Sequence, residues 1–184
     1  MYLLPVSMSL RVFQLAPVLA TVDALAEPWQ KLYAHSTVVA TLVLFGHVAG
    51  LLVAGALTLS AEASALRLDP NDDGARQRYF RNAAPARRSI AIALAIAMLS
   101  GVLLFLTDLE AFAVSTVFWT KMGLVALLLM NAAVASRLDA KIVRADDYAS
   151  GAQDDLWRRR RASARATAVL WLALVFSGSA LASR

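Results

Sequence analysis

The chain alternates between long apolar stretches and polar segments that are rich in arginine and aspartate. The apolar stretches cover about residues 36–61, 89–107, 115–136 and 166–182. A helix rises about 1.5 Å per residue and a bilayer core is about 30 Å thick, so about 20 apolar residues suffice to cross it. The pattern therefore predicts an all-α integral membrane protein with four membrane-spanning helices.

The charges of the polar segments predict how these helices are oriented. Residues 62–88 and 137–165 hold most of the arginines, whereas the connection after the second stretch carries Asp108 and Glu110. Because basic loops stay in the cytoplasm, we expect an up-down four-helix bundle with both termini on the opposite side of the membrane. The arginines nearest the membrane would either contact anionic lipid head groups or only fix the orientation. They are Arg87, Arg88, Arg158, Arg159, Arg160 and Arg161.

Residues 1–34 precede the first apolar stretch and have a mixed character. Pro5 and Pro17 should interrupt a helix here, and Trp29 is typical of a membrane interface. We expect an uncleaved interfacial segment over 1–34, followed by a four-helix transmembrane domain over 35–184. A cleaved signal peptide and a short additional span are the alternatives.

The composition agrees with a membrane protein and excludes several kinds of site. Of the 184 residues, 59% are hydrophobic, and the mean hydropathy is +0.60, whereas soluble domains are about 45–50% apolar. The chain contains no cysteine, which excludes disulfides, iron–sulfur clusters and thiolate zinc sites. The net charge of +5 comes mostly from the two arginine-rich segments, so topology explains it better than a nucleic-acid partner, and none is expected.

The first apolar stretch carries small residues at four-residue spacing, at Gly46, Gly50 and Ala54. This spacing lets a second helix approach closely, so the three positions are candidates for helix packing. Small residues are also common in any alanine-rich span, which is the alternative explanation.

His47 lies near the middle of the first stretch, where a polar side chain needs a partner. Counted from the cytoplasmic ends of two antiparallel helices, Ser100 in the second stretch lies within about 3 Å of the same depth. His47 either donates a hydrogen bond to Ser100 or a backbone carbonyl, or the two residues bind a haem b or a quinone. His35 lies about 18 Å away along the same helix, so the two histidines cannot hold one haem iron between them. The favoured expectation is that no cofactor is bound.

The third stretch contains two polar groups, Lys121 and Asn131. Lys121 would reach the periplasmic interface and form an ion pair with Asp108 there. In the cofactor alternative, either of the two could instead line a pocket around His47. Residues 69–74, between the first and second stretches, are typical of a turn and lack the spacing of a calcium loop.

Motifs of the common enzyme classes are absent from the sequence. It has no nucleophile elbow, no HExxH, no P-loop and no dinucleotide-binding fingerprint, so we expect no enzyme activity. No cluster of histidine, aspartate and glutamate has metal-ligand spacing, so no metal site is predicted. A small transporter stays an alternative, although four helices are few for alternating access.

Three segments carry a resemblance to known proteins. They are GHVAGLLVAGALTLSAEASALRL (46–68), SGVLLFLTDLE (100–110) and FWTKMGLVALLLMN (118–131). In this order they resemble uncharacterised bacterial four-helix integral membrane proteins, families of unknown function that are distantly like the copper-resistance D type membrane proteins. The resemblance covers about half of the chain and implies a membrane-embedded fold without an assigned activity. The copper link would imply metal handling, but the chain lacks the methionine or histidine clusters of a copper path.

These features together predict a non-catalytic accessory or scaffold subunit that packs against other membrane proteins, for example in a bioenergetic complex. A small redox protein that binds haem b or a quinone through His47 is the first alternative, and a small transporter is the second. The expected partners are the lipid bilayer and other membrane protein subunits.

Overall fold

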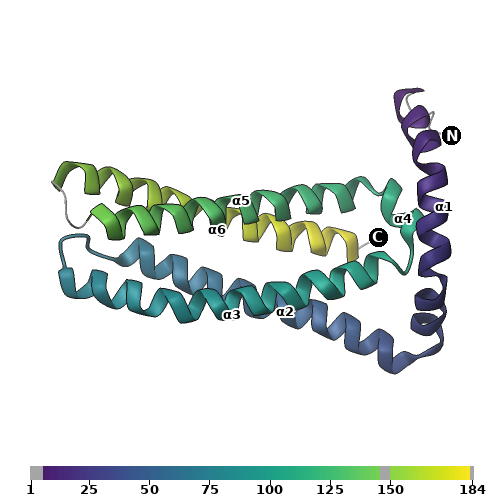
Figure 1. Ribbon diagram of the computed structural model, residues 1–184, viewed down its shortest axis with the longest axis horizontal. Helices are drawn as coiled ribbons and strands as arrows, with labels where there is room; N and C mark the ends of the chain where they lie inside the picture. The colour runs from purple at the N-terminus through teal and green to yellow at the C-terminus, as the bar shows by residue number, and fades with distance from the viewer. Residues whose placement is uncertain (1–5, 146–149, 183–184) are drawn as a thin grey trace. The chain divides into compact units, whose positions relative to one another are not determined.

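The fold follows from long runs of alanine, leucine and arginine, all of which favour helix. The computed structural model describes residues 6–145 and 150–182, and it describes side chains for 21–144 and 153–177. These residues form six helices and no strand (Figure 1). The helices are α1 Val6–His35, α2 Thr37–Arg67, α3 Asp73–Phe105, α4 Leu109–Val114, α5 Thr116–Ala145 and α6 Ser150–Ala182.

Three of the helices, α2, α3 and α5, are long and apolar enough to cross a membrane. They contain most of the predicted stretches 36–61, 89–107 and 115–136. The fourth predicted stretch, 166–182, lies within α6, and its side chains after Ser177 are outside the described residues. The described chain is therefore all-helical, with three helices whose length and composition suit a membrane protein.

The polar segments are mostly helical, so the prediction of two long polar loops is wrong. Segment 62–88 is helical except for residues 68–72, and segment 137–165 is helical over 137–145 and 150–165. Alanine and arginine are strong helix formers, and a charged side chain on an exposed helix face stays in water. The helices therefore continue well past the ends of their apolar stretches.

Aspartate side chains hold the connection between α2 and α3, which confirms the predicted turn. Asp69 Oδ1 accepts a hydrogen bond from the Asn71 amide at 2.9 Å, and Asp72 Oδ1 accepts one from the Ala75 amide at 2.9 Å. The second bond caps the N-terminus of α3, since it satisfies an amide that has no partner within the helix.

The N-terminal segment forms a single helix, α1, so the expected interruption at Pro17 is wrong. A proline removes one backbone hydrogen bond, and a helix of 30 residues keeps the others. Pro5 lies outside the described residues. The interfacial placement of this segment stays a prediction.

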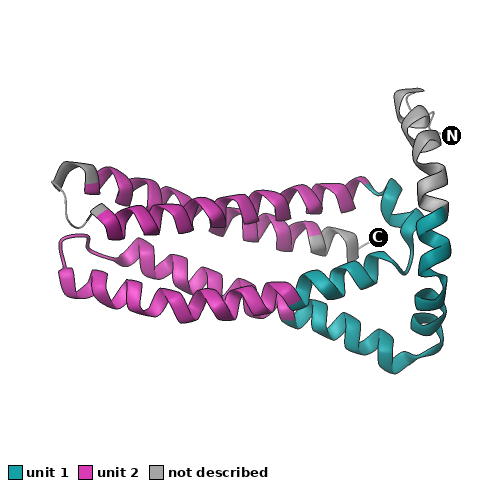
Figure 2. Cartoon of the chain, viewed as in Figure 1, with its two compact units in different colours: residues 1–49, 96–115 teal, residues 50–95, 116–184 magenta. Residues whose placement is uncertain are grey.

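The chain divides into two compact units, and each is described by itself (Figure 2). Unit 1 comprises Met1–Ala49 and Ile96–Ser115, and unit 2 comprises Gly50–Ala95 and Thr116–Arg184. The helices α2 and α3 each contribute residues to both units.

In unit 1, two side chains attach α1 to the C-terminal end of α3. Trp29 Nε1 donates to the Leu103 carbonyl at 2.9 Å, and Gln30 Nε2 donates to the Leu106 carbonyl at 3.2 Å. The last carbonyls of a helix have no partner within it, so these two bonds satisfy groups that would otherwise need water.

In unit 2, four helices contribute to one hydrophobic core. Its buried members come from α2, α3, α5 and α6: Ala54, Ala93, Leu128, Trp171 and Leu174. Gly55 of α2 lies against the Trp171 ring, and a Cβ at this glycine would lie 3.4 Å from ring atom Cζ3. A small residue here lets the backbone of α2 approach the indole of α6 closely.

A second buried cluster of unit 2 surrounds Trp157 of α6, which is only 1% exposed. The centroids of the Tyr79 and Phe80 rings of α3 lie 6.0 and 6.1 Å from that of Trp157. Aromatic rings at this separation attract one another. The cluster holds Tyr79 beside α6, where its hydroxyl meets a buried arginine.

Candidate functional site

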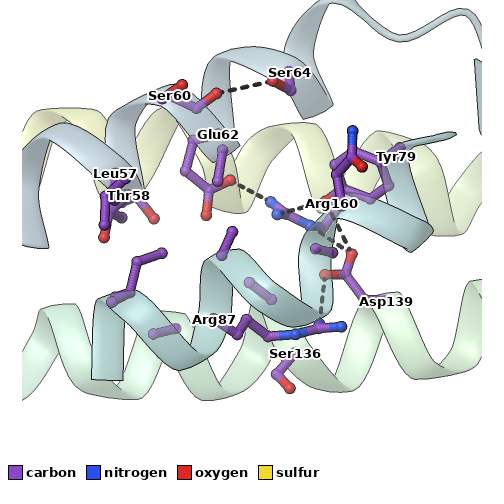
Figure 3. A pocket seen from close by; sticks show the side chains of 18 of the residues that line it. Leu57, Thr58, Ser60, Glu62, Ser64, Tyr79, Arg87, Ser136, Asp139 and Arg160 are labelled. Atoms are coloured by element: carbon purple, nitrogen blue, oxygen red, sulfur yellow. Dashed lines mark hydrogen bonds and ion pairs between the residues drawn. The ribbon is translucent and has the colours of Figure 1, made fainter. Parts of the chain in front are cut away.

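The most strongly bonded polar group of unit 2 is the guanidinium of Arg160, which is 3% exposed. Its Nη1 donates to Glu62 Oε2 at 2.5 Å, its Nε to Asp139 Oδ1 at 2.8 Å, and its Nη2 to Tyr79 Oη at 2.9 Å. Figure 3 shows Arg160 between these three side chains. One residue of α6 thus bonds to α2, α3 and α5 together. We call these four residues the Arg160 network.

The Arg160 network holds one positive and two negative charges, and Arg87 supplies the second positive charge. Asp139 also accepts from Tyr79 Oη at 3.4 Å and from Arg87 Nη1 at 3.4 Å, while Glu62 and Asp139 are 8% and 6% exposed. Two buried carboxylates therefore face Arg160 directly, and the half-exposed Arg87 shares one of them.

The network shifts the pKa values of two of its members, which lie outside the apolar stretches of their helices. Burial acts to lower the pKa of Arg160, but the hydrogen bond to Glu62 and the neighbouring acidic groups outweigh it and raise that pKa, so the guanidinium stays charged. Burial raises the pKa of Tyr79 to about 12, against the opposing positive charge of Arg160. Tyr79 is therefore a neutral donor at physiological pH.

A cavity of about 640 Å³ adjoins the network and is lined by residues of α2, α3, α5 and α6. Its apolar wall includes Leu57, Ile90, Leu94, Leu128 and Trp171. Its polar wall includes, besides the network, Ser60, Ser64, Arg78, Asn82, Arg87 and Ser136 (Figure 3). The volume lies in the range of about 300–1,000 Å³ that is common for small-molecule sites. This cavity is the candidate functional site.

The predicted site around His47 belongs to unit 1, and neither His47 nor Ser100 lines the cavity. His47 Nδ1 is 2.9 Å from the Ala97 carbonyl, and Ser100 Oγ is 3.5 Å from the same nitrogen. A carbonyl can only accept, so Nδ1 carries the proton and donates it to Ala97. The two residues do meet, as depth along the helices predicts, and a backbone carbonyl is the main partner of His47. Their role in cofactor binding stays a prediction.

Ser100 is engaged mainly with its own helix, since its Oγ donates to the Ile96 carbonyl at 2.6 Å. A Cβ at Gly101 would lie 3.0 Å from His47 Cε1 and 3.3 Å from Nδ1. The ring is therefore packed tightly against the backbone of α3.

Asn131 connects α5 to α6 in unit 2. Its Nδ2 donates to the Ser163 carbonyl at 2.9 Å and to Thr167 Oγ1 at 2.8 Å, and Ser163 Oγ donates back to Asn131 Oδ1 at 3.1 Å. The amide thus pairs both of its polar atoms across the two helices.

The predicted packing stripe lies on buried or closely packed positions. Gly46 approaches α3 in unit 1, where an added Cβ would lie 3.9 Å from Ile96 Cγ2. Gly50 and Ala54 are buried in unit 2, and Ala54 belongs to the hydrophobic core. These positions serve packing within the chain.

For Arg160 the structure corrects the expectation of a lipid head-group contact, because acidic partners on two other helices and the Tyr79 hydroxyl on a third hold its side chain in the interior. Arg158 and Arg159 are exposed and pair with Asp155. Arg161 Nη2 donates to the Leu68 carbonyl at 3.1 Å.

Asp108 accepts a hydrogen bond from the Ala111 amide and so caps α4. Its predicted ion pair with Lys121, which belongs to the other unit, stays a prediction.

Sequence reasoning missed the Arg160 network, although one signal was present. Glu62 directly follows the first apolar stretch, Asp139 lies three positions after the third, and Arg160 lies six positions before the fourth. All three residues thus fall at the same end of their helices. Arg87, Arg88 and Arg161 lie at this end too, so distance from the ends of the apolar stretches indicates a charge cluster without singling out Arg160.

Comparison with known proteins gives no relative from which a function could be transferred. The chain matches no protein-family model that was searched, and it matches no curated protein and no solved structure. Its function therefore has to be inferred from the side chains described above.

Proposed function

We propose that the chain is a non-catalytic accessory or scaffold subunit of the bacterial inner membrane, built as an up-down bundle of four transmembrane helices. The observation that carries this proposal is that three polar groups within and beside the apolar stretches, His47, Asn131 and Arg160, are bonded to neighbouring helices. Such bonds position helices, whereas catalysis needs groups that face a substrate.

Three separate contacts support this role. His47 bonds to the backbone of α3, Asn131 bonds to α6, and Arg160 bonds to three helices. In a membrane, where lipid tails give no hydrophobic force between helices, such bonds and close packing hold an assembly together.

The apolar surface of the helices supports the membrane environment and leaves room for protein partners. Large hydrophobic side chains are exposed on α2, α3, α5 and α6, among them Leu52, Leu99, Met130, Leu172 and Phe176. In water such a surface would promote aggregation, so lipid or other membrane helices are the appropriate surroundings.

Extraction from native membranes tests the proposal. The tagged chain should stay in the pellet after alkaline carbonate washing and should co-purify in mild detergent with another membrane protein at a fixed ratio. Release by carbonate would overturn the membrane placement. Recovery of the chain alone at every mild detergent concentration would overturn the subunit role.

The redox alternative rests on the tautomer of His47. Since Nδ1 donates to Ala97, Nε2 of the neutral ring keeps a lone pair, which is the arrangement of histidines that ligate a metal or haem. A Soret band that disappears in His47→Ala would establish this function in place of the subunit role. A colourless, quinone-free protein would exclude it.

A further inference from the structure

We propose that the cavity of unit 2 binds an anionic phospholipid, with its head group beside Arg87 and Arg78 and an acyl chain along the apolar wall. The proposal goes beyond the subunit role, and it rests only on the membrane placement proposed above.

The charges of the lining favour an anionic ligand. Three arginines, Arg78, Arg87 and Arg160, face two carboxylates, Glu62 and Asp139, which leaves one surplus positive charge. Arg160 and Arg87 together offset Glu62 and Asp139, so the surplus of the lining lies on Arg78, whose partner Asp72 does not line the cavity.

The contacts of Arg87 and Arg78 leave both side chains able to turn toward a ligand. Arg87 is 48% exposed and lies 3.4 Å from an Asp139 oxygen, and Arg78 is 62% exposed and lies 3.7 Å from Asp72. The Arg78–Asp72 pair is exposed on both sides and contributes little to stability, so a phosphate can replace Asp72 at small cost. Asp139 is buried, but it keeps its 2.8 Å hydrogen bond from Arg160 when Arg87 turns to a phosphate.

The order of lining residues along each helix favours an amphiphile over a small soluble anion. On α3 the lining runs from Arg78 and Asn82 at the polar end to Ile90 and Leu94 within the apolar stretch. This is a length of about 24 Å at 1.5 Å per residue.

Two further helices repeat this order. On α2 the exposed Ser64 lies nearer the polar end and Leu57 nearer the apolar interior, and on α5 the same holds for Ser136 and Leu128. A head group and a chain match this arrangement, because basic pockets between membrane helices recognise anionic head groups.

Lipid retention tests the proposal with the full chain. The protein is reconstituted in vesicles of phosphatidylcholine with one tenth phosphatidylglycerol, extracted again in mild detergent, and its retained lipid is identified by mass spectrometry. We expect phosphatidylglycerol to be enriched over its share in the vesicles. Retention of the two lipids in the vesicle ratio would overturn the proposal.

Two matched pairs of variants locate the site. Arg87→Ala should lower phosphatidylglycerol retention about fivefold, the equivalent of about 1 kcal/mol for one basic residue near the membrane surface. Arg88→Ala removes the neighbouring charge, which does not line the cavity, and should leave retention unchanged. Equal losses of phosphatidylglycerol retention in both variants would show that only the general surface charge matters, which would contradict a lipid site in the cavity.

The second pair tests the tail without changing charge. Ala132 lines the cavity and its neighbour Ala133 does not, and both are exposed, so each should tolerate phenylalanine. Ala132→Phe should abolish the enrichment and Ala133→Phe should keep it, with equal unfolding midpoints. Phosphatidylglycerol enrichment that persists in Ala132→Phe would contradict a lipid ligand in the cavity. Loss of the enrichment in the presence of glycerol phosphate, which has no acyl chain, would contradict it as well. Preferential retention of added palmitate would assign the cavity to a free fatty acid instead.

These outcomes are separate from those that decide the proposed function. Failure of carbonate resistance removes both proposals. Loss of lipid selectivity in a carbonate-resistant protein removes the lipid site alone.

Discussion

At the residue scale, the charged guanidinium of Arg160 is hydrogen-bonded to three side chains instead of to water. Glu62, Asp139 and Tyr79 each use an oxygen to replace the lost hydration. A buried ion pair gains little over water while it is complete, but an incomplete one leaves a charge without compensation. The partners therefore depend on one another strongly.

Removal of the guanidinium should be costly for this reason. Arg160→Ala leaves two buried carboxylates without their shared guanidinium, and we expect a loss of about 3–5 kcal/mol in the free energy of unfolding. Unfolding is followed by circular dichroism during titration of the detergent-solubilised protein with dodecyl sulfate. The exposed Arg158 supplies the control, since Arg158→Ala should keep the midpoint of the parent. Similar midpoints for both variants would contradict the network.

Because of Tyr79, the stability that the network contributes to the folded chain should depend on pH in the alkaline range. Its pKa is about 12 in the folded chain and about 10 when unfolded, so the folded state keeps a proton that the unfolded state releases. Its contribution to stability is full below about pH 10 and is lost as the pH rises toward 12. Unfolding midpoints between pH 9 and 12 should fall more steeply for the parent than for Tyr79→Phe. Parallel curves would show that Tyr79 titrates normally.

At the element scale, hydropathy predicted the apolar parts of α2, α3 and α5, because transfer into lipid depends on many residues added together. It did not predict the ends of the helices, since a hydropathy window treats Arg76 or Arg87 as loop residues although both suit a helix. Depth counting brought His47 and Ser100 together correctly. Hydropathy could not predict the burial of Arg160, because it assigns every arginine the same penalty for leaving water. It does not take into account that Glu62 and Asp139 offset this penalty.

The attachment of α1 to α3 supplies a prediction at the same scale. Trp29→Phe keeps the ring but loses the hydrogen bond to the Leu103 carbonyl, a change of about 1 kcal/mol. Amides of residues 21–35 should then exchange with deuterium faster. Leu25→Ala, at a position that is 77% exposed, should leave their exchange unchanged. Equal rates in both variants would show that the bond does not hold α1.

At the scale of the whole molecule, the proposed up-down topology can be tested directly, because the chain contains no cysteine. In the proposed orientation, Asn71→Cys, in the α2–α3 connection, faces the cytoplasm, and Ala111→Cys, in α4, faces the periplasm. A membrane-impermeant maleimide should label only Ala111→Cys in intact cells and both variants after lysis. Labelling of Asn71→Cys in intact cells would reverse the orientation, and labelling of both would contradict a membrane-spanning pair of helices.

The position of Arg160 in the chain also has a consequence for biosynthesis. A chain is made from its N-terminus, and Arg160 follows Glu62 by 98 residues, so both carboxylates of the network emerge before their counter-ion. Until α6 is made, Asp139 has only Arg87 as a basic partner, and Glu62 lacks the guanidinium that it pairs with in the folded chain. A chain interrupted before α6 would keep Glu62 buried without a counter-ion or leave it in water. Closure of the four helices of unit 2 around this carboxylate therefore waits for the synthesis of α6.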